Sequence, residues 1–444
     1  MFSKKRFLAL TFVALAAAAL LVGKWTIPSV NAEGETYENL RVFTEVLSVV
    51  QRNYVEEVDS KDLVYDAIKG MLRDLDPHSA FMPPQAFKEM QIDTKGEFGG
   101  LGIQISIKEG VLTVIAPIED TPAWQAGIKA GDMIMKIDGE ATKSMTLQDA
   151  VNKMRGPKGT PVTISVAREG WTELKDFTIV RDIIKIKSVK GKMMEDGIGY
   201  VKVSQFQERT APDLAKAIAD LEKEGVKSLI LDLRNNPGGL MSSAVDVASQ
   251  FIEPGKLVVY IKGRTGERTE YKSRGGKIFD KPVVVLVNQG SASGSEIVAG
   301  ALKDWNRAVV LGVKTFGKAS VQSMIPLSDG SGLRLTTARY YTPSGVSIQN
   351  TGIEPDIKVE LQAKNGEKQH VIVREKDLEG HLENEQAGGD KEPVEPEMAV
   401  LAAVSEEDDN QLQRALDLLK TWSIFKGLRE AGPAAALENV PANP

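Results

Sequence analysis

A run of small residues, Ser291-Ala292-Ser293-Gly294-Ser295, separates an apolar stretch that ends at Val287 from a helical pattern that starts at Glu296. This order predicts a buried strand followed by a tight loop and a helix. A serine in that loop would face solvent close to a helix N-terminus, which stabilises developing negative charge. The same residues also suit an ordinary N-capping turn, so the run needs further partners before it indicates chemistry.

Two more segments supply such partners. Lys318 stands between small residues, just after the strand expected at residues 308–311, and could act as a base. The pair Gly238-Gly239 follows the strand expected at residues 228–233, and glycines there let backbone N–H groups approach a substrate carbonyl. Because the carboxyl ends of parallel strands lie at one edge of a sheet, the serine run, the lysine and the glycine pair are expected to converge.

Composition narrows the chemistry further. The chain has no cysteine, which excludes disulfides, thiolate metal sites and a cysteine nucleophile. Its three histidines, His78, His370 and His381, are scattered in the sequence, so a Ser-His-Asp triad or a multi-histidine metal site is not expected. Lysine is the base that remains, and no metal or cofactor is predicted. The net charge of −6, without a long basic block beyond the N-terminus, argues against nucleic acid as a partner.

A length of 444 residues predicts several domains. Residues 1–32 have the parts of an export signal: a basic start at Lys4-Lys5-Arg6, a mainly apolar run over residues 7–22, and small residues at 30–32. We predict a cleaved signal peptide, with a retained membrane anchor as the alternative. Either one places the rest of the chain outside the cytoplasm, in a periplasm or at the outer face of the cytoplasmic membrane.

Helical segments are expected at both ends of the mature chain. Apolar residues recur every three to four positions in residues 33–95, which predicts helices. The polar, acidic residues 361–397 are expected to form a linker. In residues 398–444, an apolar stripe predicts a helix that packs on the parent domain: Leu412, Ala415, Leu416 and Leu419. A homodimer contact through the helical ends is the alternative to such packing.

Residues 96–185 resemble a PDZ domain. Short alternating strands and two short helices occur in the order of that domain, with Ala126-Gly127-Ile128-Lys129-Ala130-Gly131-Asp132 at the right distance. The segment Gly99-Gly100-Leu101-Gly102-Ile103 matches its carboxylate-binding loop, where consecutive backbone N–H groups capture the terminal carboxylate of a peptide. The edge strand that follows pairs with the peptide backbone. The resemblance implies a site for protein C-terminal tails.

Residues 186–360 alternate between strand and helix patterns. Strands are expected at residues 199–203, 228–233, 257–261, 283–287 and 308–311, with helices at 211–221, 240–251 and 296–305. This alternation predicts an α/β domain with a largely parallel sheet, whose sites form at the strand ends.

Together these features resemble the carboxyl-terminal processing peptidases, also called tail-specific serine proteases. The match runs from about residue 40 to 360 and includes the segments Tyr340-Tyr341-Thr342-Pro343-Ser344-Gly345 and Gly352-Ile353-Glu354-Pro355-Asp356-Ile357. The resemblance implies an α/β protease core of the crotonase/ClpP type, with an inserted PDZ domain and helical N- and C-terminal segments.

The resemblance also assigns catalytic roles. It implies Ser293 as the nucleophile, Lys318 as the general base, and Gln322 as the residue that orients the lysine. Lys318 must be neutral to accept the serine proton, so its pKa must lie far below the value of a free lysine. Burial away from water and from other cations is the means available for that.

The oxyanion donors implied by the resemblance are the backbone N–H of Gly294 and that of Gly239 or Gly238. The family often has alanine where Gly294 stands and glycine where Ala319 stands. Each difference exchanges one small residue for another, and a glycine at 294 gives the oxyanion hole more freedom.

We therefore predict a serine endopeptidase that cleaves exported proteins near C-terminal tails, which its PDZ domain recognises. Binding of a tail is expected to gate the catalytic site, with Arg155 as a candidate coupling residue; a solvated turn charge is its plainer role. If Ser293 is not the nucleophile, Ser291 and Ser295 are next. An adaptor protein is a further partner that the sequence leaves open.

Two other functions compete with this prediction. A non-catalytic PDZ adaptor on a degenerate protease scaffold is the first, but it gives no reason for Ser293, Lys318 and Gln322 to be intact together. An acyl-CoA enzyme of the crotonase type is the second. It shares the α/β core and the Gly-Gly loops, yet explains neither the Ser-Lys pairing nor an export signal joined to a PDZ domain.

Overall fold

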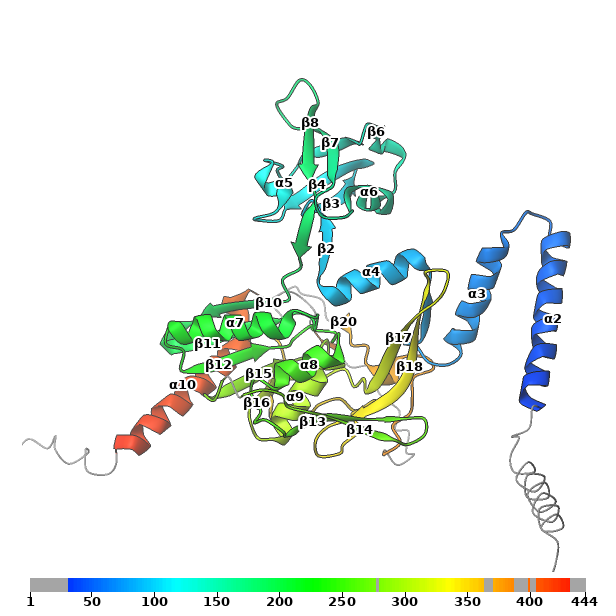
Figure 1. The fold of residues 1–444 in the computed structure, drawn as a ribbon. Helices are drawn as coiled ribbons and strands as arrows, with labels where there is room; N and C mark the ends of the chain where they lie inside the picture. Colours follow the sequence, from blue (N-terminus) through cyan, green and yellow to red (C-terminus); the bar gives the residue numbers. More distant parts are fainter. Residues whose placement is uncertain (1–30, 277–278, 363–369, 387–397, 400–404, 432–444) are drawn as a thin grey trace, which may run out of the picture. The chain divides into compact units, whose positions relative to one another are not determined.

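Figure 1 shows the computed structural model, which describes residues 31–276, 279–362, 370–386, 398–399 and 405–431. The export signal predicted at residues 1–32 therefore lies almost entirely outside the described residues. Among the described helices, none combines the length and the apolar composition needed to cross a bilayer.

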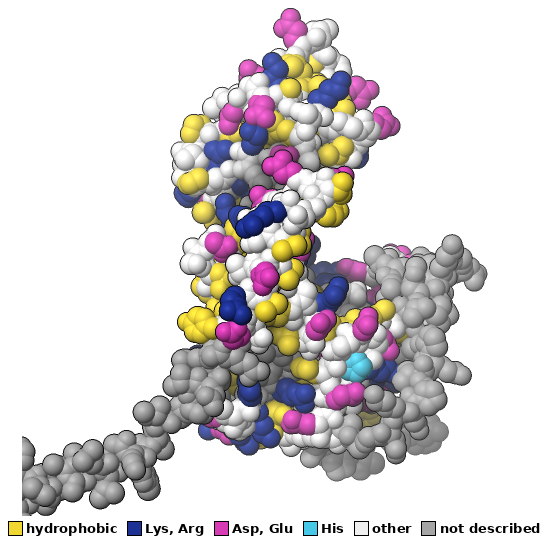
Figure 2. Space-filling view, turned by 90° about the vertical axis from the view of Figure 1, so that its right-hand side faces the viewer, with side chains coloured by type: hydrophobic (Ala, Val, Ile, Leu, Met, Phe, Trp, Pro, Cys, Tyr) yellow, Lys and Arg dark blue, Asp and Glu magenta, His cyan; other side chains and the backbone are white. Residues whose placement is uncertain are grey.

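On the face shown in Figure 2, basic and acidic side chains are interspersed.

Two helices form a unit of their own, which ends at Met71. Helix α2 spans Asn31–Asn53 and helix α3 spans Ser60–Arg73, where helical periodicity was expected. The larger unit starts at Leu72 and contains the next helix, α4 (Pro84–Lys95), which begins with a proline at its first position and ends at Gly96 in the left-handed conformation.

Residues 97–185 form a β-rich module. Its elements are β2 (Glu97–Gly100), β3 (Ile103–Lys108), β4 (Val111–Pro117), α5 (Pro122–Gln125), β5 (Met133–Ile137), β6 (Glu140–Ala141), α6 (Leu147–Met154), β7 (Pro161–Ala167), β8 (Lys175–Val180) and β9 (Asp182–Lys185). The main sheet has the order β3-β4-β5-β7-β8, so β3 is an edge strand, and β2 pairs with β9 in a separate ladder. Three residues of the main sheet are fully buried: Val114, Ile134 and Ile164. The module has its own hydrophobic core.

The α/β core is built on a mostly parallel sheet with the order β10-β11-β12-β15-β16-β19. The strands are β10 (Val189–Met193), β11 (Ile198–Val203), β12 (Ser228–Asp232), β15 (Val283–Val287), β16 (Val309–Gly312) and β19 (Ile357–Lys358). Only the edge strand β10 is antiparallel to its neighbour among these described strands. Fully buried apolar runs in β12 and β15 are typical of parallel strands covered on both faces. The predicted parallel α/β sheet is confirmed.

Helices cover both faces of this sheet (Figure 1). On one face lie α7 (Thr210–Lys223), α8 (Met241–Ala248) and α9 (Gly294–Asp304). On the other face lies α10 (Asn410–Ala431), whose stripe packs on Ile230 and Leu286. Leu412, Ala415, Leu416 and Leu419 are all buried there, which confirms that the C-terminal helix packs on the parent domain.

A second, antiparallel sheet adjoins the core. It contains β1 (Ala80–Met82), β13 (Leu257–Gly263), β14 (Arg268–Lys272), β17 (Ser320–Pro326) and β18 (Gly332–Tyr341). The assignment of residues 257–261 to the parallel sheet was wrong, because β13 pairs antiparallel with β14 and with β18. The short connection between β13 and β14 suits an antiparallel partner, whereas a parallel one needs a long crossover.

The linker predicted at residues 361–397 is wrong for its central part. Residues 372–386, called the strap below, are packed against the core, and Arg374 and Glu375 within it are buried. Their hydrogen bonds to distant residues, described below, fix a stretch whose polarity alone indicates a linker. Just before the strap, β20 (His370–Val371) pairs with β21 (Met398–Ala399). Short 3-10 helices occur at Thr142–Ser144, Glu195–Gly197, Glu375–Asp377 and Glu406–Asp408.

Candidate active site

The loops that follow β12, β15 and β16 meet at one edge of the parallel sheet, as the sequence predicts. The Ala292 N–H donates to the carbonyl of Asn236 at 3.0 Å, which joins the β15 loop to the β12 loop. The Phe316 N–H donates to the carbonyl of Ser291 at 3.1 Å, which joins the β16 loop to the same site. The serine run, the lysine segment and the glycine pair are therefore held together by backbone hydrogen bonds.

The structure distinguishes the serines of the run. Ser291 and Ser295 are fully buried, and their hydroxyls donate to the carbonyls of Leu233 and Asn236, each at 2.8 Å. Ser293 is only half-buried. The outer two hydroxyls are thus committed to holding the β12 loop, and the middle serine is the one that retains access to solvent.

Ser293 has an unusual backbone conformation. Its φ of 53° and ψ of −108° are rare for a residue other than glycine, and it is the N-cap of α9. Such strain costs of order 1–3 kcal/mol and is found where a sharp strand-to-helix turn presents a nucleophile. The strain is held by the Ser293 N–H, which donates to the Glu296 carboxylate at 2.8 Å.

The glycine pair lies directly against this turn. A Cβ added to Gly238 would lie 2.9 Å from the Ser293 Cβ and from the Gly294 nitrogen, so only glycine fits. The Gly238 N–H already donates to the Asn236 side chain at 2.9 Å. Within the described part of the chain, the N–H groups of Gly239 and Gly294 make no hydrogen bond. Of the two glycines predicted as oxyanion donors in this loop, Gly239 is therefore the one whose amide is available.

Lys318 sits in a half-buried position with charges around it. Burial lowers the pKa of Lys318 to about 8, because the ammonium form loses hydration. Glu375, Glu296 and Asp76 favour the ammonium and oppose this effect, and Arg334 adds to it. A lysine with this pKa is partly neutral near pH 7 and can act as a base.

Glu296 was missed by the sequence analysis. It is fully buried and accepts hydrogen bonds from four donors: the N–H groups of Ser293, Gly317 and Lys318, at 2.8, 2.7 and 3.0 Å, and the Thr315 hydroxyl at 2.5 Å. Burial raises the pKa of Glu296 to about 7, against these donors, which favour the carboxylate. The Ser-x-x-Glu spacing of a capping box is the signal that could have found it.

Tyr340 holds the same two residues from the other side. Its hydroxyl lies 2.6 Å from the carbonyl of Lys318 and 3.1 Å from the carbonyl of Ser293, and can donate to either. Burial raises the pKa of Tyr340 well above its usual range, so the hydroxyl stays protonated and remains a donor. Glu296 and Tyr340 together fix the backbones of Ser293 and Lys318 relative to one another.

Gln322 does not contact the lysine through a hydrogen bond. Its amide donates to the hydroxyls of Ser320 and Thr336, at 3.0 and 3.2 Å. Among the described residues, no hydrogen bond joins the side chains of Ser293 and Lys318 either; such bonds are often loose before substrate binds. The orienting role of Gln322 stays a prediction.

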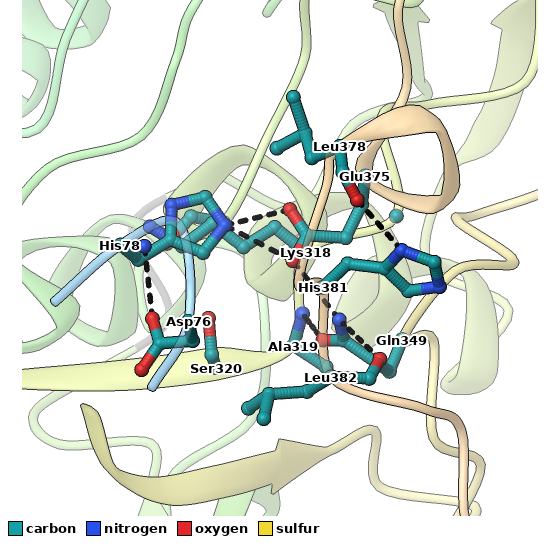
Figure 3. A network of polar contacts seen from close by, with 12 residues as sticks. Asp76, His78, Lys318, Ala319, Ser320, Gln349, Glu375, Leu378, His381 and Leu382 are labelled. Atoms are coloured by element: carbon teal, nitrogen blue, oxygen red, sulfur yellow. Dashed lines mark hydrogen bonds and ion pairs between the residues drawn. The ribbon is translucent and has the colours of Figure 1, made fainter. Parts of the chain in front are cut away.

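His78 has a place near Lys318 that its sequence position did not indicate. Its Nε2 lies 2.7 and 3.0 Å from the two carboxylate oxygens of Glu375 in the strap, within the network of Figure 3. His381 bonds to the carbonyl of Leu378 in the same network. No histidine of the described chain bonds to Ser293, so a Ser-His-Asp arrangement is not formed.

The predicted carboxylate-binding loop of the β-rich module is partly a strand. Gly99 and Gly100 pair with β9, whereas Leu101 and Gly102 lie between β2 and β3. In the part of the chain described, the N–H groups of Leu101 and Gly102 make no hydrogen bond, and Gly102 has a φ of 80°. Free amides beside the edge strand that begins at Ile103 have the geometry that captures a carboxylate.

Arg155 is not a solvated turn charge. Its guanidinium lies 3.2 Å from the Glu89 carboxylate on α4 and over the ring of Phe98, with the centroid at 4.7 Å. A second contact joins the same elements, because the Gln85 amide donates to the Asn152 side chain on α6 at 2.9 Å. Arg155 thus links the end of α6 to the helix that leads into the module.

Comparisons with known proteins agree with this arrangement. The chain matches the models of peptidase family S41 over residues 197–359, of the PDZ domain over 113–168, and of the Activating protease CtpB N-terminal domain over 17–86. It is 44% identical over 410 residues to the carboxy-terminal-processing protease of Bartonella bacilliformis, which covers 91% of this chain and 93% of that one.

Two further proteins are similar to this chain. The chain is 37% identical over 349 residues to the carboxyl-terminal-processing protease of a Synechocystis species, covering 77% of this chain and 80% of that one. A solved photosystem II D1 C-terminal processing protease is 33% identical, with a TM-score of 0.42 and coverage of 71% and 92%. The identity and coverage of the two curated relatives, with the family matches, show that this chain belongs to the carboxyl-terminal processing proteases of the S41 serine peptidase family.

Proposed function

We propose that this protease is a serine endopeptidase of the Ser-Lys type, with Ser293 as the nucleophile and Lys318 as the general base. The observation that carries the proposal is the joint fixation of these two residues. Glu296 accepts from both of their amides, and the Tyr340 hydroxyl reaches both of their carbonyls. A fold that ties a strained serine to a half-buried lysine in this way supports a nucleophile and its base.

The chemistry follows from the protonation of the lysine. Neutral Lys318 takes the proton of Ser293 as the serine oxygen attacks the scissile carbonyl. The resulting ammonium then gives this proton to the leaving amine, and an acyl group stays on the serine. Water, deprotonated by the same lysine, releases the acyl group as a carboxylic acid. The lysine passes the proton of the water to the departing Ser293 oxygen, so both residues return to their starting states.

Charge that develops on the carbonyl oxygen needs fixed donors. The amides of Gly239 and Gly294 supply these, since Gly238 is already engaged with Asn236. Gly294 is also the first residue of α9, so the helix N-terminus adds its dipole. A Cβ at Gly294 would lie 2.9 Å from the ring of Phe206, a close approach that this chain avoids with glycine.

The PDZ module supplies recognition of the substrate in this proposal. A protein C-terminal tail would add as a strand beside β3, with its carboxylate on the amides of Leu101 and Gly102. The preference for apolar tail residues follows from the PDZ resemblance. Substrates are accordingly proteins with an exposed, loosely folded C-terminal end.

The module is also proposed to gate the site, and a chain of contacts supports this. Arg155 pairs with Glu89 on α4, and the Thr94 carbonyl near the end of α4 accepts the N–H of Glu208 at 3.2 Å. Phe206, two residues before Glu208, donates its N–H to the carbonyl of Gly238 at 2.9 Å. A movement of α6 would therefore be transmitted towards the glycine pair.

The proposal that the chain is exported rests on its N-terminal sequence. The basic start, the apolar run over residues 7–22 and the small residues at 30–32 support secretion or anchoring at the outer face of the cytoplasmic membrane. The substrates would then be exported proteins, which share that compartment. A homodimer through the helical ends and an adaptor protein are further partners consistent with the sequence.

The test uses the purified chain and a loosely folded protein that ends in apolar residues. The unsubstituted protease should cleave it, and Ser293→Ala should lower kcat by at least about 10³-fold. Ser295→Ala is the matched control, because its hydroxyl only holds the Asn236 carbonyl and its loss should leave most of the activity. Equal cleavage by Ser293→Ala would overturn the nucleophile, and no cleavage by any form would favour the non-catalytic adaptor.

A further inference from the structure

The strap brackets the loop that carries Lys318. The Arg374 guanidinium donates to the carbonyls of Lys314 and Thr315, at 2.7 and 2.6 Å. The next residue, Glu375, donates its N–H to the carbonyl of Phe316 at 3.2 Å. The strap is thus bonded to successive residues of the loop immediately before Lys318.

A side-chain bridge continues on the far side of the lysine. The Gln349 amide donates to Glu375 Oε1 at 3.0 Å, and the Gln349 carbonyl oxygen accepts the Ala319 N–H at 2.9 Å. Gln349 is fully buried. The Glu375 carboxylate is therefore linked through one side chain to the residue that follows Lys318, as Figure 3 shows.

The third contact of Glu375 comes from the other end of the chain. His78 Nε2 lies 2.7 Å from Glu375 Oε2, and the Glu375 side chain is fully buried. The backbone of His78 is itself fixed, since its N–H donates to the Asp76 carboxylate at 2.8 Å and its carbonyl accepts from Arg334 on β18 at 2.8 Å. Segments almost 300 positions apart in sequence thus clamp one carboxylate beside the proposed base.

We propose that Glu375 is a positioning residue for Lys318: clamped by His78 and Gln349, its carboxylate fixes the lysine loop and stabilises the ammonium that forms when Lys318 takes the serine proton. The inference rests on the proposed Ser-Lys function and adds a residue to it. The strap is then part of the active site and not a connection between domains.

Electrostatics gives the reason for such a group. A half-buried ammonium loses much of its hydration, so a nearby anion lowers the free energy of the protonated state. Other charged groups also act on Lys318: Glu296 from α9, Asp76 from the turn before β1, and Arg334 from β18. His78, from the same turn as Asp76, contacts Glu375. The Glu296 carboxylate already accepts hydrogen bonds from four donors. Glu375 differs from it because Glu375 is itself a residue of the strap.

The test removes the negative charge of Glu375 and keeps the shape of its side chain. In Glu375→Gln, the protonated state of Lys318 loses its partner, so the acid limb of the kcat/KM profile should move to lower pH by about one pH unit. The maximal kcat should fall several-fold, with KM nearly unchanged, because the change acts on the base and not on substrate binding. Glu375→Asp keeps the charge and should leave the limb near its original position.

A second measurement does not require cleavage. The ε-carbon signal of Lys318 in lysine-labelled protein, assigned as the one absent from Lys318→Met, reports its titration directly. Its midpoint should move down by the same amount in Glu375→Gln. If the protease cleaves nothing but this shift occurs, the positioning role stands while the proposed reaction fails.

The matched control is Glu385→Gln, the same change on the same strap. Glu385 is exposed and bonds to the Tyr341 hydroxyl and to Arg339, away from the lysine loop. Glu385→Gln should leave both the acid limb of the kcat/KM profile and the titration midpoint of Lys318 unchanged. An unaltered midpoint in Glu375→Gln, with only a lower Tm, would show a purely structural anchor and overturn the inference.

Discussion

Ser293 and Lys318 meet the demands of their chemistry through the residues that surround them. Ser293 is strained at the start of α9, and Lys318 lies in a half-buried site with a lowered pKa. Glu296 supports both positions, because its carboxylate accepts the N–H groups of Ser293 and of Lys318. At the scale of single residues, the proposed nucleophile and the proposed base share one support.

The protonation of Lys318 predicts how activity depends on pH. Its pKa is lowered to about 8, so the neutral base is the minor form below that pH and the major form above it. We expect kcat/KM to rise tenfold per pH unit on the acid side and to level off above an apparent pKa near 8. Rates for a tail substrate between pH 5.5 and 9.5 measure this, and a plateau already reached at pH 6 would contradict it.

The same pKa has a consequence for stability. A lysine whose folded pKa is depressed contributes stability above its unfolded value of 10.5, and this contribution is lost as the pH falls through about 8. Lys318→Met removes the buried ammonium. The variant should be inactive yet more stable at pH 7 by roughly 1–3 kcal/mol, and the gain should shrink to below about 1 kcal/mol at pH 10. Urea unfolding at both values checks this; equal stability at pH 7 would argue against a buried ammonium.

At the scale of elements, α10 holds the loop that carries the glycine pair. The Arg234 guanidinium, just after β12, donates to both oxygens of Asp409, at 2.9 and 2.7 Å, and to Asp232 at 2.8 Å. Burial by itself would lower the pKa of Arg234. Its two carboxylate partners, Asp232 and Asp409, outweigh burial, so the pKa of Arg234 lies well above its ordinary value. A C-terminal element thereby fixes the start of the proposed oxyanion loop.

This contact, made by the residue just before α10, can be compared with an ion pair on the helix itself. Asp409→Ala leaves a buried guanidinium short of a partner and should cost about 2–4 kcal/mol of unfolding free energy, with a loss of kcat. Glu195→Ala removes an exposed ion pair with Lys420 at 2.6 Å and should cost less than about 1 kcal/mol. Chemical unfolding of both variants measures the difference, and equal small costs would show that α10 does not support the loop.

At the scale of the whole molecule, the PDZ domain and the protease core have separate hydrophobic centres. Separate cores allow one part to move without unfolding the other. The contacts of α4 with α6 and with the segment around Phe206 give the two parts a physical connection. Gating requires that these contacts differ between the tail-free and tail-bound states.

Arg155 provides the test of this gate. Arg155→Ala should leave the affinity of a fluorescent tail peptide unchanged and lower kcat for a tailed protein several-fold. The variant loses the contacts with Glu89 and Phe98 and keeps the amides of Leu101 and Gly102. Lys158→Ala is the control, because Lys158 stands in the same turn but pairs with exposed Asp182 at 2.6 Å. Unchanged turnover in Arg155→Ala would leave the module as a tether only.

The sequence by itself determined the local elements and the residues that bear chemistry. Period-two and period-3.6 patterns predict the core strands and helices, and small residues after strands mark the loops that carry Ser293, Lys318 and Gly239. The absence of cysteine and the scarcity of histidine point to lysine as the base. The predicted core elements are confirmed because each depends on residue type and on neighbours within a few positions, whereas the catalytic roles stay predictions.

The tertiary structure decided what depends on distant partners. It buries Ser291 and Ser295 against the β12 loop, places β13 in an antiparallel sheet, and brings His78 to Glu375 in a stretch whose composition indicates a linker. No local period encodes contacts between segments hundreds of residues apart. The burial that lowers the pKa of Lys318 arises only when those segments close around it. The sequence therefore singles out the lysine as the candidate base, and the fold makes part of it neutral near pH 7.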